Sequence, residues 1–240
     1  SNRPVRYPAS LPETERRAPD PMRFAEHGAE RLNAAAHAQL QRIEAGIAPL
    51  PGDRPGLRLK GVSELAELLG PNGAIGSLLS PFANGVARPV RAILFDKNPT
   101  TNWSLAWHQD RTICVRERRD GIGFGPWTVK SGLLHVAPPF ALLAQMVTVR
   151  IHLDDVPHDN APLLIAPGSH RLGLVREDAI EVGVAQCGVH ACEAQVGDIW
   201  VYATPILHAS EAAVVPRRRR VLQVDYAGFE LPGGLEWSGI

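Results

Sequence analysis

From residue 90 onward the chain consists of short runs of β-branched and aromatic residues separated by turn signals. The clearest runs are 90–97, 145–154, 163–165, 199–203 and 219–227, with clusters of Gly, Pro, Asn and Asp between them. Helical segments do not alternate with these runs, which disfavours a parallel βαβ sheet. About eight short strands in this arrangement predict a double-sheet jelly roll of cupin type. We therefore expect a mainly β fold of the α+β class, a double-stranded β-helix with helices packed outside.

The N-terminal part carries helical patterns instead. Residues 1–22 are rich in Pro and Arg and lack periodicity, so we expect an extended or partly disordered arm. From Arg23 to about Gly46, apolar residues recur at steps of three and four, which predicts one helix with a single apolar face. These residues are Leu32, Ala36, Leu40, Ile43 and Ile47.

Two shorter helices are expected before the strands begin. Ser63 can cap a helix that ends at Leu69, because Gly70-Pro71 follows. The stretch from Ile75 to Phe82 predicts a third. All three helices are expected to pack on the outside of a sheet.

The length of the chain bounds its domain organisation. At 240 residues it can form one sizeable core, and all-β folds of this size are often single domains. We expect one domain over residues 23–240, with a helical part at 23–85 and a jelly-roll core at 86–228.

The charge balance argues against a nucleic-acid or membrane partner. The chain has 25 Lys and Arg residues and 25 Asp and Glu residues, so no overall field attracts a polyanion. No apolar run approaches the roughly 20 residues that span a bilayer. The three cysteines lack a C-x-x-C spacing, which favours a reducing cytoplasm over a disulfide framework. We expect a soluble, cytoplasmic protein whose partner is a small molecule.

The tetrapeptide Trp107-His108-Gln109-Asp110 places an imidazole and a carboxylate two residues apart. On a strand, His108 and Asp110 point to one face, while Trp107 and Gln109 point to the other. Two histidines and one carboxylate leave three positions of an octahedral ion open, which suits non-haem Fe(II). The plainer interpretation of His-x-Asp alone is a partly buried histidine paired with a nearby carboxylate.

His208 is the best candidate for a third ligand among the nine histidines. It lies on a late strand after the Gly197-Asp198 turn, whereas most of the others lie on the N-terminal helix or near turns. Ser210 follows it, and Arg219 comes eleven residues later. An arginine there can hold the distal carboxylate of a dicarboxylic acid in a bidentate, charge-assisted pair.

The strand 145–154 adds polar groups to one face of an apolar run. Thr148, Arg150 and His152 share this face, and burying them without partners would cost several kcal/mol. This pattern predicts a polar cavity rather than a dry core. We take Thr148 as a further contact for a dicarboxylic acid and Arg150 as a substrate contact.

Six motifs follow one another in a recognisable order. They are His108-x-Asp110, Leu153-Asp154-Asp155, Asn160-x-Pro162-Leu163, Pro167-Gly168-Ser169-His170, Gly197-Asp198, and His208-x-Ser210 with Arg219. This order is similar to the phytanoyl-CoA dioxygenase family of Fe(II)/2-oxoglutarate-dependent oxygenases, over roughly residues 90–228.

The resemblance implies a role for each matching residue. It implies iron at His108, Asp110 and His208, with 2-oxoglutarate at Arg219 and Ser210 and O₂ as the oxidant. The Pro-Gly-Ser-His segment is interpreted as a structural turn. Strand alternation alone puts Arg217 on the same side as Arg219, so the choice of Arg219 depends on the family spacing.

The resemblance also bears on the reaction. Halogenating relatives replace the carboxylate ligand with a small residue, so Asp110 favours hydroxylation of a C–H bond or a related oxidation. No coenzyme A signature is present, so a fatty acyl-CoA substrate does not follow. Two alternatives stay open: a catalytically inactive, metal- or ligand-binding cupin, and a zinc hydrolase that uses the same three ligands.

The stretch from Arg111 to Pro139 is predicted to be a long, irregular insertion, because it is rich in Gly and Pro. It leaves directly from the metal-binding strand, so Trp127 and His135 are the expected wall of the substrate pocket. Lys97, at the end of the preceding strand, is expected to meet an anionic group of the substrate. The alternatives are that Trp127 anchors the insertion, that His135 is structural, and that Lys97 is solvated.

Overall fold

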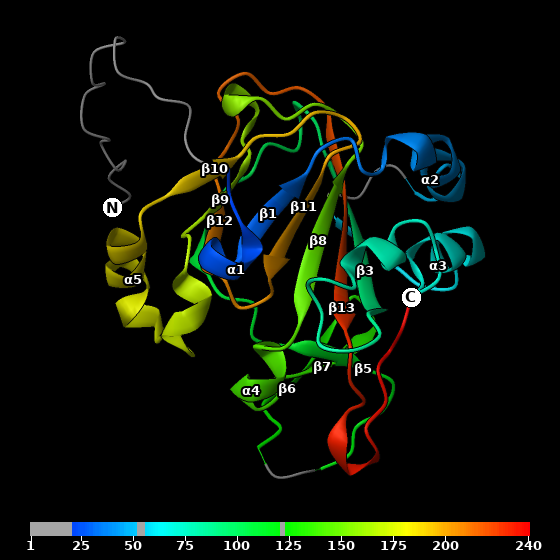
Figure 1. Ribbon diagram of the computed structural model, residues 1–240, viewed down its shortest axis with the longest axis vertical. Coiled ribbons are helices and arrows are strands. Elements are labelled where there is room, and N and C mark those ends of the chain that lie inside the picture. Colours follow the sequence, from blue (N-terminus) through cyan, green and yellow to red (C-terminus); the bar gives the residue numbers. More distant parts are fainter. Residues whose placement is uncertain (1–20, 52–55, 121–122) are drawn as a thin grey trace.

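The computed structural model of the protein describes residues 21–51, 56–120 and 123–240. Its described part is mainly β, with short helices on the outside (Figure 1). The arm predicted for residues 1–22 lies outside the described residues except for Pro21 and Met22. No helix in the described ranges is long and apolar enough to cross a membrane.

The largest sheet has six antiparallel strands and forms the centre of the molecule (Figure 1). In order across the sheet they are β1 (Ala29–Leu32), β11 (Ile199–Ala203), β8 (Val147–His152), β13 (Arg219–Ala227), β3 (Arg88–Lys97) and β2 (Gly56–Leu59).

A second sheet of four antiparallel strands packs against one face of the first. Its order is β10 (His190–Cys192), β9 (Leu163–Ile165), β12 (His208–Ser210) and β4 (Leu105–His108). Leu163 and Ile165 of this sheet share a buried cluster with Trp200 and Tyr202 of the large sheet. Two packed antiparallel sheets with outer helices confirm the predicted jelly-roll class, and within the described ranges they do not close into a barrel.

The helices are short. The α-helices are α1 (Phe24–His27), α2 (Leu40–Ile47), α3 (Ser63–Leu69), α4 (Phe140–Leu143) and α5 (Ile180–Cys187). Single 3₁₀ turns are η2 (His37–Gln39), η3 (Gly76–Leu79), η4 (His158–Asn160), η5 (Ser169–Leu172), η6 (Glu177–Ala179) and η7 (Pro232–Gly234).

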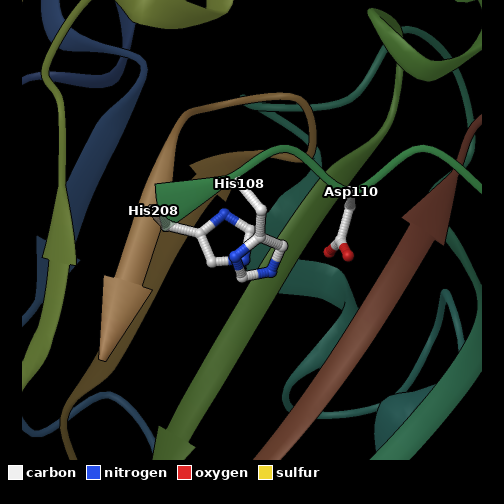
Figure 2. A group of neighbouring side chains, drawn as sticks. All are labelled: His108, Asp110 and His208. Atoms are coloured by element: carbon white, nitrogen blue, oxygen red, sulfur yellow. The ribbon is translucent and has the colours of Figure 1, made fainter. Parts of the chain in front are cut away.

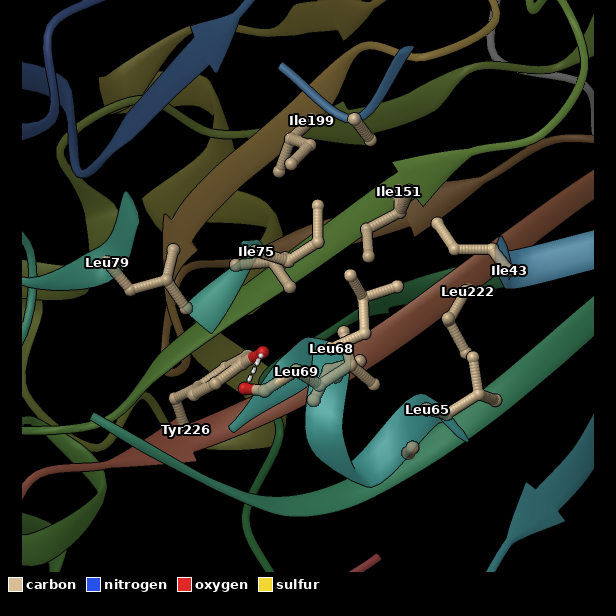
Figure 3. Packing of buried hydrophobic residues seen from close by; sticks show 14 of the residues in the cluster. Ile43, Leu65, Leu68, Leu69, Ile75, Leu79, Ile151, Ile199, Leu222 and Tyr226 are labelled. Carbon is tan, nitrogen blue, oxygen red and sulfur yellow. Dashed lines mark hydrogen bonds between the residues drawn. The ribbon is translucent and has the colours of Figure 1, made fainter. Parts of the chain in front are cut away.

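The main hydrophobic core lies between the outer face of the six-stranded sheet and helices α2 and α3 (Figure 3). Leu65, Leu68 and Leu69 of α3 are buried there against Leu222 of β13. The Tyr226 hydroxyl donates a hydrogen bond to the Leu69 carbonyl oxygen at 2.9 Å. Burial of each such aliphatic side chain contributes about 1.5–3 kcal/mol to the free energy of unfolding. This layer therefore stabilises the six-stranded sheet from its outer face.

Strand β13 separates two environments by simple alternation. Its even-numbered residues, such as Leu222, belong to the hydrophobic core. On the opposite face, toward the four-stranded sheet, three of its odd-numbered residues are buried polar groups: Arg219, Gln223 and Asp225.

The single helix predicted from Arg23 to about Gly46 is wrong. The helical spacing holds only in α2; Leu32 instead ends strand β1, which pairs with β11 at the edge of the large sheet. The chain leaves helical geometry at Gly28, whose φ is 72°, and again at Ala34, whose φ is 51°. Backbone pairing with the sheet has overridden the local pattern.

The other two helix predictions are correct in place and differ in detail. Helix α3 ends at Leu69 as expected, but its N-cap is Val62 and the Ser63 hydroxyl donates to Glu64 instead. The third predicted helix is the single 3₁₀ turn η3 within Ile75–Phe82.

The insertion between Arg111 and Pro139 contains regular strands in its described part, which corrects the prediction of an irregular segment. It folds into a three-stranded antiparallel sheet, ordered β5 (Ile113–Val115), β7 (Leu133–Val136) and β6 (Trp127–Lys130). Ser131 and Gly132 connect β6 to β7 with φ values of 51° and 77°, the geometry of a two-residue hairpin turn. Gly132 of this segment therefore serves the tight turn between β6 and β7.

Candidate metal centre and co-substrate cavity

Three side chains converge at the edge of the four-stranded sheet (Figure 2). His208 begins β12 and lies directly opposite His108, which ends β4. Asp110 follows β4 by two residues and turns its carboxylate toward the two rings. One potential ligand atom from each of the three lies within 4.8 Å of the others. The structure thus brings together the three residues that the sequence suggested.

The two imidazoles are held in the same way. The Nδ1 atom of His108 lies 2.8 Å from the Ala106 carbonyl oxygen, and that of His208 lies 2.9 Å from the Ile206 carbonyl oxygen. Each contact requires a proton on Nδ1, so Nε2 keeps its lone pair for a metal ion.

The charge states around the triad suit a divalent cation. Burial lowers the pKa of His208 to about 4, so its ring is neutral. Burial alone would raise the pKa of Asp110, but the positive charge of Arg91, with smaller effects from the two histidines, holds it below its usual value. Two imidazoles and one carboxylate are the donor set of a non-haem Fe(II) site with open positions.

A buried ion pair supports the carboxylate ligand. The Arg91 Nε donates to Asp225 at 2.5 Å, and its Nη2 lies 3.7 Å from Asp110. Asp225 also accepts a hydrogen bond from the Thr148 hydroxyl at 3.1 Å. Arg91 therefore links the third ligand to the inner face of the six-stranded sheet.

Two further polar contacts fix the segments that carry the ligands. The Gln109 side chain is buried, donates to the carbonyl oxygens of Gly173 and Pro205, and accepts from the Val175 amide. The Leu207 amide, next to His208, donates to the Ser169 hydroxyl at 2.8 Å. These contacts support the interpretation of the Pro-Gly-Ser-His segment as a structural turn.

A cavity of about 210 Å³ opens beside the triad, between the two main sheets. Six cationic side chains line it: Arg58, Arg91, Lys97, Lys130, Arg150 and Arg219. Among its lining residues in the described part of the chain, Asp110 is the sole carboxylate.

Arg219 and Lys97 lie side by side at one end of this cavity, because they are register partners on the neighbouring strands β13 and β3. Arg219 is 5 % exposed and makes no ion pair within the described residues, and burial lowers its pKa to about 9. The Lys97 ammonium donates to the Trp103 carbonyl oxygen at 2.8 Å and to the Ser210 hydroxyl at 3.4 Å. This end of the cavity presents two cationic side chains to an anionic ligand.

The neighbouring arginines point elsewhere. Arg217 forms a surface ion pair with Asp159. Arg218 pairs with Asp96, and Arg220 pairs with Asp154 and Glu44. Of the four consecutive arginines, Arg219 is the one that lines the cavity.

The remaining predicted site residues fall into two groups. Arg150 lines the cavity, where its guanidinium donates to Gln223 at 2.9 Å. Thr148 does not line it, because its hydroxyl is occupied by Asp225 and lies 3.0 Å from that of Thr204. The predicted contact between Thr148 and 2-oxoglutarate is corrected accordingly.

The predicted pocket wall at Trp127 and His135 is also corrected. Trp127 packs against the apolar cluster under the insertion, and His135 is fully buried in β7. Neither residue lines the cavity; Lys130, at the tip of the same hairpin, does. Lys130 borders a Ser-Gly turn signal in the sequence, whereas no local pattern could have placed Arg58 here.

Residues 31–221 match the model of the phytanoyl-CoA dioxygenase family. The chain belongs to this family. It is a non-haem dioxygenase that uses Fe(II), 2-oxoglutarate and O₂, which confirms the predicted class and cofactors. No curated protein sequence matches this dioxygenase.

Solved structures share its fold. EctD from S. alaskensis with bound Fe matches at a TM-score of 0.60 and 16 % identity, over 85 % of this chain and 74 % of EctD. The α-ketoglutarate-dependent epimerase SnoN from nogalamycin biosynthesis matches at 0.61 and 15 %, over 88 % and 86 %. AviO1 from Streptomyces viridochromogenes Tue57 matches at 0.58 and 20 %, over 88 % and 93 %. At these identities the likeness concerns the fold.

Proposed function

We propose that this dioxygenase hydroxylates a small molecule at a C–H bond, with iron held by His108, Asp110 and His208. The observation that carries the proposal is the triad of two imidazoles and one carboxylate, which opens onto a cavity that also holds Arg219, an arginine without an ion pair among the described residues. When bound, iron and 2-oxoglutarate supply an oxidation by O₂ that converts 2-oxoglutarate to succinate and CO₂ and inserts one oxygen atom into the substrate.

The residues of the chain bind and orient the co-substrate and the metal ligands. Arg219 donates to the distal carboxylate of 2-oxoglutarate, and Ser210 adds a hydrogen bond beside it. Lys97 is proposed to act at this same end, because it is the register partner of Arg219 and contacts Ser210. This assignment replaces the earlier expectation that Lys97 meets the substrate. Arg91 keeps Asp110 ionised and oriented.

The proposal includes a cytoplasmic location. Cys114, Cys187 and Cys192 are all free thiols, which supports a reducing cytoplasm. The cavity volume of about 210 Å³ supports a small-molecule substrate.

The proposal is tested by anaerobic titration of the apoprotein with Fe(II) and then 2-oxoglutarate. We expect a weak visible charge-transfer band that appears only when both are present. Oxygen uptake with formation of succinate should follow with Fe(II) and not with Zn(II). A folded protein that gives no band, or one that hydrolyses substrates with Zn(II), would contradict the proposal and favour the inactive cupin or the zinc hydrolase.

A further inference from the structure

The cavity is lined by more cationic side chains than Asp110 and a bound 2-oxoglutarate can neutralise. Arg91 is neutralised by Asp225 and Asp110. Arg219 and Lys97 lie at the end proposed for 2-oxoglutarate. Arg150, which donates to Gln223, is an electrostatic neighbour of both and belongs to the same end. Arg58 and Lys130 remain on another wall, and neither forms an ion pair within the described part of the chain.

Arg58 comes from the edge strand β2 and is incompletely satisfied. Its Nη1 donates to the Ser131 hydroxyl at 2.8 Å, whereas its buried Nε has no hydrogen-bond partner among the described residues. Burial, followed by the repulsion of Arg91, lowers the pKa of Arg58. A buried donor without a partner is unfavourable, and an oxyanion at this wall would supply the missing acceptor.

Lys130 reaches the same wall from a different element. It is the last residue of β6 and precedes the tight turn at Ser131 and Gly132. The contact from Arg58 to Ser131 fixes the tip of this hairpin over β2. The hairpin therefore carries the Lys130 ammonium to the cavity, although the side chain is otherwise exposed to solvent.

This wall is separate from the end that holds Arg219. Arg58 is in register with Ile93 on β3, and Ile93 with Gln223 on β13, four residues beyond Arg219. With strands about 4.8 Å apart and a rise of about 3.3 Å per residue, the two arginine Cα atoms are separated by about 16 Å. A five-carbon co-substrate held at Arg219 and at the triad leaves Arg58 and Lys130 for a second ligand.

We propose that Arg58 and Lys130 form a subsite for an oxyanion group of the primary substrate, such as a carboxylate or a sulfate. The inference rests on the proposed function, since it assigns 2-oxoglutarate to the other end of the cavity. It names the substrate class as a small anionic molecule whose charged group is held between the hairpin and β2, while its C–H bond faces the triad.

Calorimetry with nickel(II) in place of iron tests the subsite without turnover. The nickel-loaded protein is saturated with 2-oxoglutarate and titrated with sodium sulfate and, in parallel, with sodium acetate. We expect at least one anion to bind; tighter binding of acetate indicates a carboxylate substrate, and tighter binding of sulfate a tetrahedral oxyanion. Lys130→Gln and Arg58→Gln should each weaken the better anion about tenfold, which corresponds to about 1.4 kcal/mol.

Arg116→Gln is the matched control, because Arg116 lies in the same insertion, is exposed and does not line the cavity. It should leave anion binding unchanged. Lys130→Gln alters an exposed side chain, so it keeps the test decisive even if Arg58→Gln disturbs the hairpin. No anion binding to the wild-type protein, equal binding to Lys130→Gln, or competition between the anion and 2-oxoglutarate would each overturn the subsite.

Failure of the subsite and failure of the proposed function give different results. If 2-oxoglutarate binds the nickel-loaded protein and requires Arg219, while neither anion binds, the subsite alone is wrong. If 2-oxoglutarate itself does not bind, the proposed function fails before the subsite is reached.

Discussion

Replacement of Arg91 by methionine is predicted to be strongly destabilising. Arg91 is buried, its Nε donates to Asp225 at 2.5 Å, and its Nη2 lies 3.7 Å from Asp110. Asp225 is itself 3 % exposed and would keep only the hydrogen bond from Thr148. Breaking a buried pair from one side leaves an uncompensated charge and costs about 3–5 kcal/mol of the free energy of unfolding.

The double variant Arg91→Met/Asp225→Asn separates lost charge pairing from lost packing. It removes both members of the Arg91–Asp225 pair, so neither is left as an unpaired charge, and it should be more stable than the sum of its two single variants predicts. We expect a coupling of about 1–3 kcal/mol, as is typical of residues in one polar network. Urea denaturation of the apoprotein, monitored by tryptophan fluorescence, gives the free energy of unfolding of the two single variants and the double variant. The three curves are fitted with one shared m-value.

Arg88→Met provides the control on the same strand. Arg88 is 54 % exposed and pairs with Glu230 at the surface, so its loss should cost less than about 1 kcal/mol. The reasoning is refuted if Arg91→Met is as mild as this control, or if the effects of Arg91→Met and Asp225→Asn simply add.

Three further predictions concern ligand binding. His208→Ala or Asp110→Ala should lose bound iron, measured by metal analysis after desalting, while the circular dichroism melt persists; retained iron would exclude them as ligands. Arg219→Ala should keep iron but weaken 2-oxoglutarate binding about 10- to 100-fold, because a charge-assisted hydrogen bond contributes about 1.5–3 kcal/mol, whereas Arg217→Ala should change nothing; the reverse result would mean that the wrong arginine was chosen. Burial, then Arg219, lowers the pKa of Lys97 to about 7, so 2-oxoglutarate affinity should fall as the pH rises through about 7, and Lys97→Met should flatten that profile. An unfolded lysine keeps its proton to higher pH, so the same shift should make the apoprotein more stable as the pH rises from about 7 toward about 10.5; a pH-independent affinity in the wild type would contradict this role.

The candidate metal centre was predictable because its residues follow local rules. Alternation on a strand puts His108 and Asp110 on one side, and the late position of His208 brings β12 next to β4 in this fold. Arg219 required the family spacing, since strand alternation alone allowed Arg217 as well. The ion pair of Arg217 with Asp159 joins segments far apart in the chain, so no local pattern predicts it.

The errors arose where distant contacts decide local structure. Leu32 fits a helical spacing, yet its backbone completes the edge of the six-stranded sheet. Trp127 was expected in the pocket wall because the insertion leaves directly from the metal-binding strand. Strand pairing within the insertion directs it instead into an apolar cluster and brings Lys130 to the cavity. Arg58 has no sequence signal, because strand β2 reaches the site only through its register with β3.

The alternation along β13 has a consequence for how this protein can change over generations. Substitutions at odd positions of β13 change the face toward the cavity, and substitutions at even positions change the face toward the main hydrophobic core. The two faces can therefore vary independently. A single-residue deletion between Val221 and Asp225 would do both kinds of damage at once, because it would exchange the two faces for the rest of the strand. Lineages of this enzyme should therefore tolerate length variation in the loop 211–218 and almost none within β13.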